Sequence, residues 1–317
     1  MSEARLQHLP LPLFAAPMGI GGLGMTWREA ARGLGAPAFV GEGLLLLAAF
    51  LWLVLAGLHL ARALRHPAAL TADLAHPVRA AFAGTISIGV MILAGGLTPY
   101  LPGLAANVWL LGVTAHVGIG VWTVRGLLRS PKQAAVLTPP LLIPLVGNIL
   151  APVFGVPLGF PALNWMLFGL GALLWFMLQP LLLYRLIIGP PLPEALRPAL
   201  VIFLAPPAVG ALSLAGLTGG FGPGPLACLG LALLVAAVML TLAADFARAP
   251  FAMSWWGWTF PSAAFASALQ LAARAHPAAW QMPLLWLVLL AVSGLITLVA
   301  ATTLWRLMDG RLLVPDA

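Results

Sequence analysis

The sequence predicts an all-α protein that crosses a membrane ten times, as five helical hairpins. Three observations predict this class: an apolar composition, ten long apolar segments, and prolines inside alternate segments. Of the 317 residues 62% are hydrophobic and 7% are charged, whereas a soluble domain carries about 25% charged residues. Because so few side chains suit water, we expect residues 1–317 to form a single transmembrane domain.

The ten apolar segments each approach the length of about 20 residues that a membrane-spanning helix needs. They cover residues 11–27, 39–62, 80–97, 104–128, 136–154, 160–187, 198–217, 226–247, 251–271 and 279–308. An even number of crossings places both chain ends on one side. The connections between segments are too short for a soluble catalytic or nucleotide-binding domain, so the function is expected inside the bilayer.

The basic residues are divided unevenly between the two sides that this order of segments defines. One side carries Arg5, Arg62, Arg65, Arg79, Arg125, Arg129, Lys132, Arg185, Arg197, Arg248, Arg306 and Arg311, and the other Arg28, Arg32 and Arg274. This asymmetry predicts a multi-pass protein of the cell inner (plasma) membrane with both termini cytoplasmic. The net charge of +7 lies on scattered short loops, so we expect no nucleic-acid partner.

The odd-numbered segments are interrupted in their middle, whereas the even-numbered ones are not. The first, fifth, seventh and ninth contain Pro17, Pro144, Pro206 and Pro261. The third contains Ser87 and Gly89 instead, and Pro180 and Pro283 of the even segments lie near helix ends. A proline frees a backbone carbonyl, which membranes tolerate next to protein or water. We therefore expect kinked odd helices that line a central pore, although kinks that serve packing alone are the alternative.

Such a pore is expected to be neutral and narrow. The odd segments have no charged residue or histidine in their interiors, which argues against a proton relay or cation site and favours gating by constriction. Phe260 precedes Pro261 and follows Gly257, so its ring can leave the regular helical position. From its position in the sequence alone, Phe260 could be either a packing residue or a gate. Asn148 either caps a freed carbonyl or lines the pore, and Glu42 suits a helix N-terminus or the outer mouth.

Five segments resemble the tellurite-resistance and dicarboxylate transporter family, the TehA-like bacterial relatives of plant guard-cell slow anion channels. They are Phe14–Gly19 (FAAPMG), His76–Arg79 (HPVR), Ile143–Asn148 (IPLVGN), Leu204–Ala208 (LAPPA) and Trp255–Pro261 (WWGWTFP). Each motif is short, but the five occur in the family's order across the whole chain. The resemblance implies five hairpins around a pore in each subunit of a homotrimer.

The resemblance also assigns roles to residues. It implies that Phe260 is the gate of an anion channel, and that the pore is lined by Ala15, Pro17, Gly19, Ser87, Pro144, Asn148, Pro206, Gly257 and Pro261. Two positions depart from the family, with Ser87 where relatives carry proline and Ala15 where they carry glycine. The expected partners are small monovalent inorganic anions and membrane lipid. The alternative is a secondary transporter or exporter of C4-dicarboxylate, sulfite or tellurite.

The remaining candidate residues suggest no chemistry beyond transport. Cys228 is the single cysteine, which excludes an intrachain disulfide and a multi-cysteine metal site. His59 and His116 fall at different depths, which argues against a bis-histidine haem. Asp245 and Arg248 are expected to form an ion pair at the membrane interface. Because no paired intramembrane carboxylates are present, we expect no enzymatic activity, no cofactor and no metal.

Overall fold

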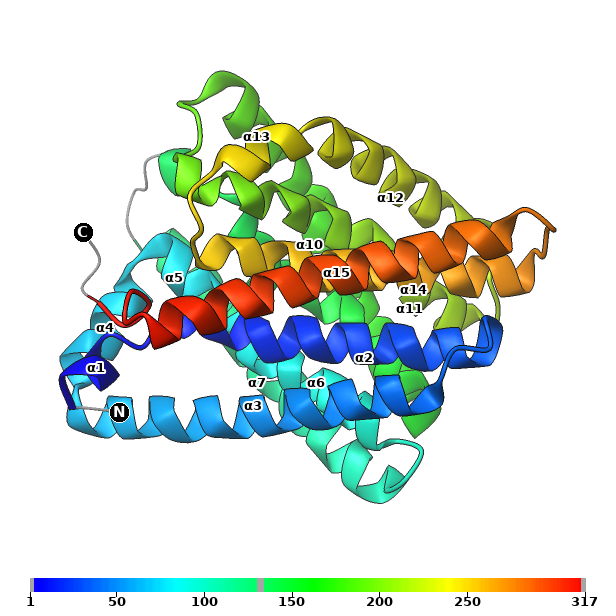
Figure 1. The fold of residues 1–317 in the computed structure, drawn as a ribbon, viewed down its shortest axis with the longest axis horizontal. Coiled ribbons are helices and arrows are strands. Elements are labelled where there is room, and N and C mark those ends of the chain that lie inside the picture. The colour runs from blue at the N-terminus through cyan, green and yellow to red at the C-terminus, as the bar shows by residue number, and fades with distance from the viewer. Residues whose placement is uncertain (1–2, 130–133, 315–317) are drawn as a thin grey trace.

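The structure is a computed structural model that describes residues 3–129 and 134–314, so Lys132 lies outside the described residues. Every regular element in these ranges is a helix (Figure 1). The α-helices are α1 (Glu3–Gln7), α2 (Ala15–Gly33), α3 (Ala38–Arg65), α4 (Pro67–Ala75), α5 (Pro77–Ala81), α6 (Gly84–Leu97), α7 (Pro102–Leu128), α8 (Leu142–Val146), α9 (Ala151–Gly155), α10 (Pro161–Ile188), α11 (Ala205–Thr218), α12 (Pro223–Thr241), α13 (Ala243–Arg248), α14 (Thr259–Ala275) and α15 (Gln281–Met308). The 3₁₀ helices are η1 (Leu11–Phe14), η2 (Ala134–Val136), η3 (Pro139–Leu141), η4 (Gly147–Leu150), η5 (Val156–Leu158), η6 (Glu194–Leu204) and η7 (Met253–Trp258).

Eight helical segments of the described residues are long and apolar enough to span a membrane. They are Ala38–Arg65, Pro77–Leu97, Pro102–Leu128, Pro139–Leu158, Pro161–Ile188, Glu194–Thr218, Pro223–Thr241 and Gln281–Met308. The chain is therefore a multi-pass membrane protein. Two of the ten segments expected from the sequence, those that contain α2 and α14, fall outside this set. The α2 helix is rich in alanine and glycine and α14 in alanine, and the two pack closely on each other, so they do not need large lipid-facing side chains.

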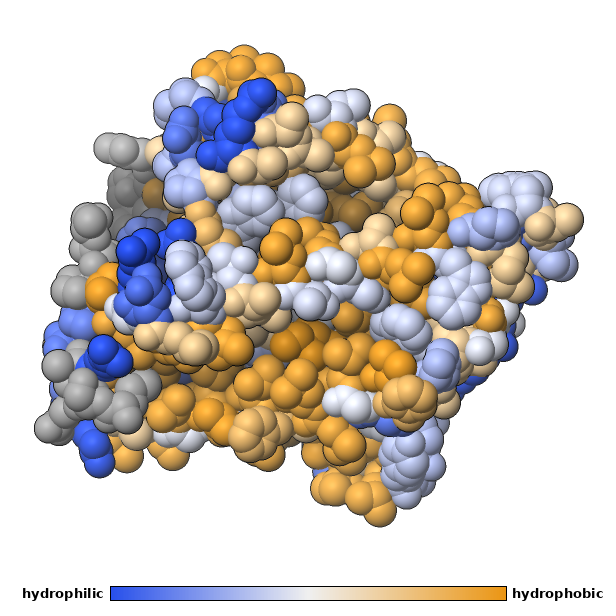
Figure 2. All heavy atoms as spheres, in the orientation of Figure 1, coloured by the Kyte–Doolittle hydropathy of each residue, from blue (hydrophilic) through white to orange (hydrophobic). Residues whose placement is uncertain are grey.

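The spanning segments fall into a buried and an exposed group. Between 67% and 78% of the most apolar stretch is buried in Pro77–Leu97, Pro139–Leu158 and Glu194–Thr218, against 17% to 33% in α3, α7, α10, α12 and α15. Each buried segment packs against the exposed helix that follows it in the chain. Orange, hydrophobic atoms cover much of the middle of the surface in Figure 2, as expected of side chains that contact lipid.

The four mid-segment prolines lie where a 3₁₀ helix changes into an α-helix. Pro17, Pro144 and Pro261 are the third residues of α2, α8 and α14, which follow η1, η3 and η7, and Pro206 is the second residue of α11, which follows η6. In the first turn of an α-helix a proline costs little, because its missing N–H has no acceptor four residues earlier. The third segment breaks differently, at the turn of Phe82 and Ala83 between α5 and α6.

The first and last described segments meet at one end of the molecule, beside α1 and α4 (Figure 1). Leu6 and Leu9 pack there with Leu313. Arg62 of α3, which is 3% exposed, donates to the carboxylate of Asp73 at 2.7 Å and to the backbone carbonyl of Gln7 at 3.0 Å. The buried ion pair therefore ties α3, α4 and the N-terminal segment together.

A second buried arginine joins helices at the opposite end. Arg28 of α2 donates to both carboxylate oxygens of Glu42 in α3, at 2.8 and 2.6 Å. It also donates to the carbonyls of Gly95 and Gly96, both at 3.2 Å, which lie in the last turn of α6. Glu42 is thus the partner of Arg28, a pairing that the two expectations for Glu42 did not include. The expected ion pair of Asp245 with Arg248 is confirmed at 3.3 Å.

Candidate functional site

An apolar cavity of about 50 Å³ lies among the buried segments. Its walls are formed by Ala15, Met18, Phe82, Ile88, Leu142, Ile143, Val146, Gly147, Ile149, Leu150, Ile202, Ala205, Pro206, Val209, Gly257, Phe260 and Pro261. All of these residues are apolar, and all belong to the odd-numbered segments of the sequence. The exposed helices α3, α7, α10, α12 and α15 contribute none of them. The cavity lies at the level of the junctions where 3₁₀ helices change into α-helices.

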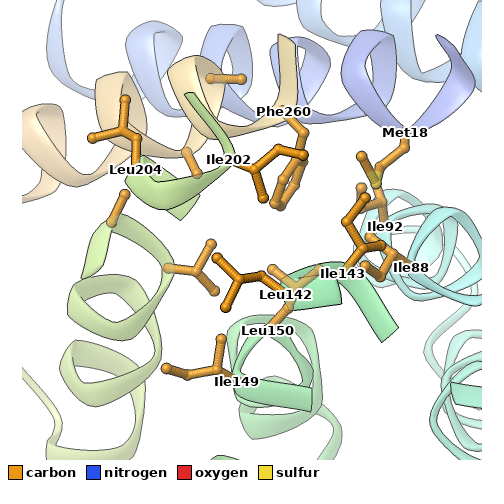
Figure 3. Packing of buried hydrophobic residues seen from close by; sticks show 14 of the residues in the cluster. Met18, Ile88, Ile92, Leu142, Ile143, Ile149, Leu150, Ile202, Leu204 and Phe260 are labelled. Carbon is orange, nitrogen blue, oxygen red and sulfur yellow. The ribbon is translucent and has the colours of Figure 1, made fainter. Parts of the chain in front are cut away.

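Phe260 reaches into this space from the first turn of α14. Figure 3 shows its ring directed toward the region bordered by Ile202, Leu142 and Ile143. The ring is 8% exposed, and its other edge rests on α2, because a Cβ atom added to Gly22 would stand 3.0 Å from the ring atom Cδ2. Glycine at position 22 therefore allows the ring to pack directly against the helix backbone.

The structure brings together five of the ten residues expected in the pore. Ala15, Pro206, Gly257, Phe260 and Pro261 all line the cavity, although they come from three segments that are far apart in the sequence. These are the positions next to the changes from 3₁₀ to α-helix, where the chain path bends around the space.

The other five expected pore residues do not line the cavity. Pro17 and Pro144 are buried in the first turns of their helices. Gly19 faces the side chain of Thr259, which a Cβ atom there would meet. Asn148 is 2% exposed and its side-chain oxygen has no hydrogen-bond partner among the described residues. Ser87 forms hydrogen bonds with Gly84 and His116 inside the protein.

Ser87 forms a buried pair with His116 of α7. The Ser87 Oγ lies 2.8 Å from His116 Nδ1 and 3.1 Å from the carbonyl oxygen of Gly84. The bond to Gly84 joins the Ser87 hydroxyl to a backbone carbonyl in the first turn of α6. His116 is fully buried, and its Nε2 lies against the backbone of Gly147, where a Cβ atom would stand 2.5 Å away. A histidine from an exposed-group helix thus stands directly behind one cavity-lining residue.

Sequence reasoning missed several residues of the cavity wall. Met18, Ile88, Leu142 and Ile202 line it, but as ordinary apolar residues of membrane segments they carry no distinguishing signal. For two of them, their position in the sequence could have indicated that they line the cavity: Met18 and Leu142 each lie within two residues of a mid-segment proline. Gly22, which supports the Phe260 ring, has no such marker.

The electrostatics of the wall are those of a neutral, dehydrating surface. No residue that lines the cavity is charged or titratable, and no group of three metal-binding side chains occurs within residues 3–129 and 134–314. Such a wall offers an ion no fixed partner.

These features define a class: a multi-pass membrane protein with a neutral internal cavity that is bordered by an aromatic ring. The chain belongs to the family of voltage-dependent anion channels (SLAC1), which its residues 8–308 match. The resemblance to TehA-like proteins is thereby confirmed.

Individual relatives come from plants and archaea. The S-type anion channels SLAH3 and SLAH2 of Arabidopsis thaliana are 25% and 23% identical, over 81% and 83% of this chain and 42% and 52% of their own lengths. The chain thus spans about half the length of these plant relatives. The uncharacterized transporter MJ0762 of Methanocaldococcus jannaschii is 25% identical over 85% of this chain and 86% of its own length.

Proposed function

We propose that the chain is an anion channel whose pore runs through the apolar cavity and whose gate is Phe260. The pore is formed by the odd segments of five hairpins, with α2 and α14 as the two crossings beyond the eight apolar ones. The observation that carries this proposal is that every residue of the cavity wall comes from alternate segments.

The closed state follows from the size of the cavity. About 50 Å³ accommodates a few water molecules, which is less than an anion with its hydration shell requires. An ion passes only when the Phe260 ring leaves its contact with Gly22 and Ile202. Because the ring is held by packing alone, a modest rearrangement at Gly257, in the η7 helix that leads into α14, is sufficient to move it.

Preference for small monovalent anions rests on charge outside the wall and dehydration inside it. The side with the excess of arginines raises the local anion concentration at that mouth, and we assign it to the cytoplasm, with both termini there and the chain in the inner membrane. The positive edge of an aromatic ring tolerates a passing anion better than a cation. A divalent ion loses more hydration energy and is excluded. We further propose a homotrimer in lipid, with one pore in each subunit.

A carrier of C4-dicarboxylate, sulfite or tellurite is the second candidate, and the archaeal relative's description as a transporter favours it. A channel and a carrier differ in transport rate, because a conformational cycle on the millisecond scale limits a carrier to about a thousand ions per second. Current through a planar bilayer that contains the purified protein decides between them. Unitary currents far above that limit support the channel. Substrate exchange below it, with no resolvable current in any variant, contradicts the channel.

A further inference from the structure

A groove of about 120 Å³ lies beside the C-terminal end of α7, at the end of the molecule that carries α4 and α5 (Figure 1). Its volume is more than twice that of the central cavity. The groove is lined by residues of α4, α5, α7, η2 and η3, which include Leu74, Pro77, Ala81, Trp122, Gly126 and Leu141. No residue lines both spaces, so the groove is a separate feature of the surface.

The groove is apolar and continues the lipid-facing surface of α7. Among its lining residues only Trp122 and Thr123 have polar side-chain atoms, and the Thr123 hydroxyl already donates to the carbonyl of Ile119 at 2.8 Å. Next to the groove along α7, Val121 and Leu128 are 64% and 82% exposed. A hydrocarbon chain in the bilayer therefore reaches the groove over apolar surface, without displacing a hydrogen-bonded group.

The depth of the groove follows from its place on α7. Trp122 follows Pro102, the first residue of the helix, by 20 residues, and at 1.5 Å per residue this is about 30 Å, the thickness of the hydrocarbon core. Trp122 thus lies at the boundary between hydrocarbon and headgroups, where tryptophan is enriched. Arg125 and Arg129 follow it by one and two turns on the same side of the helix, which places both in the headgroup layer.

The charges beside the groove are positive and uncompensated. Arg125 and Arg129 are exposed, and neither forms an ion pair with another residue of 3–129 or 134–314. The acidic residue of α4, Asp73, is already bound by Arg62 at 2.7 Å and by Arg79 at 3.2 Å. A guanidinium matches the oxygens of a phosphate. A zwitterionic headgroup carries its own cation beside the phosphate, so two free arginines favour a headgroup with net negative charge.

We propose that this groove binds one anionic phospholipid. An acyl chain packs between α7 and the segments α4 and α5, beside Trp122 and Gly126, and the phosphate contacts Arg125 and Arg129. Gly126 leaves room for the chain, because a Cβ atom added there would have no packing partner within 4 Å. The partial negative charge at the C-terminal end of α7 opposes a phosphate, but at about half an elementary charge it is outweighed by two guanidinium groups.

Native mass spectrometry of the purified, delipidated protein tests the site by counting bound lipid. Phosphatidylglycerol and phosphatidylcholine are titrated separately, and we expect one saturable site per subunit that prefers phosphatidylglycerol. Gly126→Leu fills the groove and should abolish this site. The variant is expected to fold, because its new side chain points into open space and leucine favours a helix more than glycine does. The matched control is Gly103→Leu, at the other end of α7 and equally unobstructed, which should bind like wild type.

The role of the two arginines is tested in the double variant Arg125→Gln, Arg129→Gln. We expect its half-saturating concentration of phosphatidylglycerol to rise by about 10- to 30-fold, since each basic residue near an anionic headgroup contributes about fivefold. Its binding of phosphatidylcholine should change little. Arg248→Gln is the control, because Arg248 is exposed on α13 and paired with Asp245, and it should leave both affinities unchanged.

Several results would overturn the proposal. Equal affinity of wild type for the two lipids refutes the anionic headgroup, and an unchanged affinity of the arginine double variant does so even if Gly126→Leu fails to fold. Binding of phosphatidylglycerol by Gly126→Leu as by wild type removes the lipid from the groove. If that variant also loses its oligomeric mass, the groove is an interface between copies of the chain. Because bound lipid is counted and no current is measured, the outcome is independent of the proposed gate.

Discussion

Replacing Phe260 by alanine should open the pore. Burying a phenylalanine side chain is favourable by about 1.5 to 3 kcal/mol, and each 1.4 kcal/mol is about a factor of ten in an equilibrium. The packed position of the ring, 8% exposed against Gly22, is therefore favoured over a displaced one by about 10- to 100-fold. We expect chloride and nitrate currents in planar bilayers to rise by the same factor in Phe260→Ala at equal protein amount.

The same substitution should cost little stability. A phenylalanine-to-alanine change in a close-packed core costs about 3 to 5 kcal/mol, part of which arises from the cavity left behind. Phe260 already borders an apolar cavity of about 50 Å³, so one side of its ring makes no packing contact that the substitution could remove. We expect a loss below about 3 kcal/mol and a normal elution profile of the assembled protein.

The control for this prediction lies on the same helix. Phe265 is half-buried and packs against the core without lining the cavity, so Phe265→Ala should lower stability without raising the current. The reasoning is refuted if correctly assembled Phe260→Ala carries no more current than wild type, because Phe260 would then be a packing residue.

Three further outcomes are expected. In a Cys228→Ala background, single cysteines on the buried segments should react with water-borne reagents, whereas mid-helix positions of α7 and α12 stay protected; equal labelling of both groups contradicts the assignment of inner and outer helices. Tags at the two chain ends should both be cytoplasmic, and a tag detected outside reverses the topology. Arg62→Gln should lower the free energy of unfolding by about 2 kcal/mol, since buried Asp73 loses a charge-assisted hydrogen bond and keeps only its pair with Arg79 at 3.2 Å. Arg248→Gln, at an exposed pair, should leave it unchanged in the same denaturant titration.

The division into buried and exposed segments was accessible from the sequence because proline reports it. A mid-segment proline requires protein or water around the backbone it disturbs, and the segments with Pro144 and Pro206 are among the most buried. The sequence did not predict that the prolines mark changes from 3₁₀ helix to α-helix. The eleven-residue 3₁₀ helix η6 has an apolar pattern that does not distinguish it from an α-helix, so a kink was expected where the helix type changes.

Contacts between helices were less predictable than their positions. Ser87 and His116 were each noted, but their 2.8 Å contact depends on the register between α6 and α7, which apolar periodicity does not determine. The pairing of Arg28 with Glu42 was missed for a simpler reason: α2 continues to Gly33, six residues beyond the expected end of the first span. A helix that packs on other helices stays helical past the point where its apolar run stops.

An apolar wall has a consequence for how such a channel diversifies. Conductance that depends on the width and dryness of the pore changes in small steps through exchanges among alanine, valine, isoleucine, leucine and methionine, which differ by a few carbon atoms or only in branching. Cores tolerate such exchanges at small cost. With 17 lining residues spread over five segments, many single-nucleotide changes adjust throughput without introducing a charge. Relatives with different physiological anions are therefore expected to differ in side-chain volume at positions such as Met18 and Ile202. They are not expected to differ by gaining charged or polar binding residues in the wall.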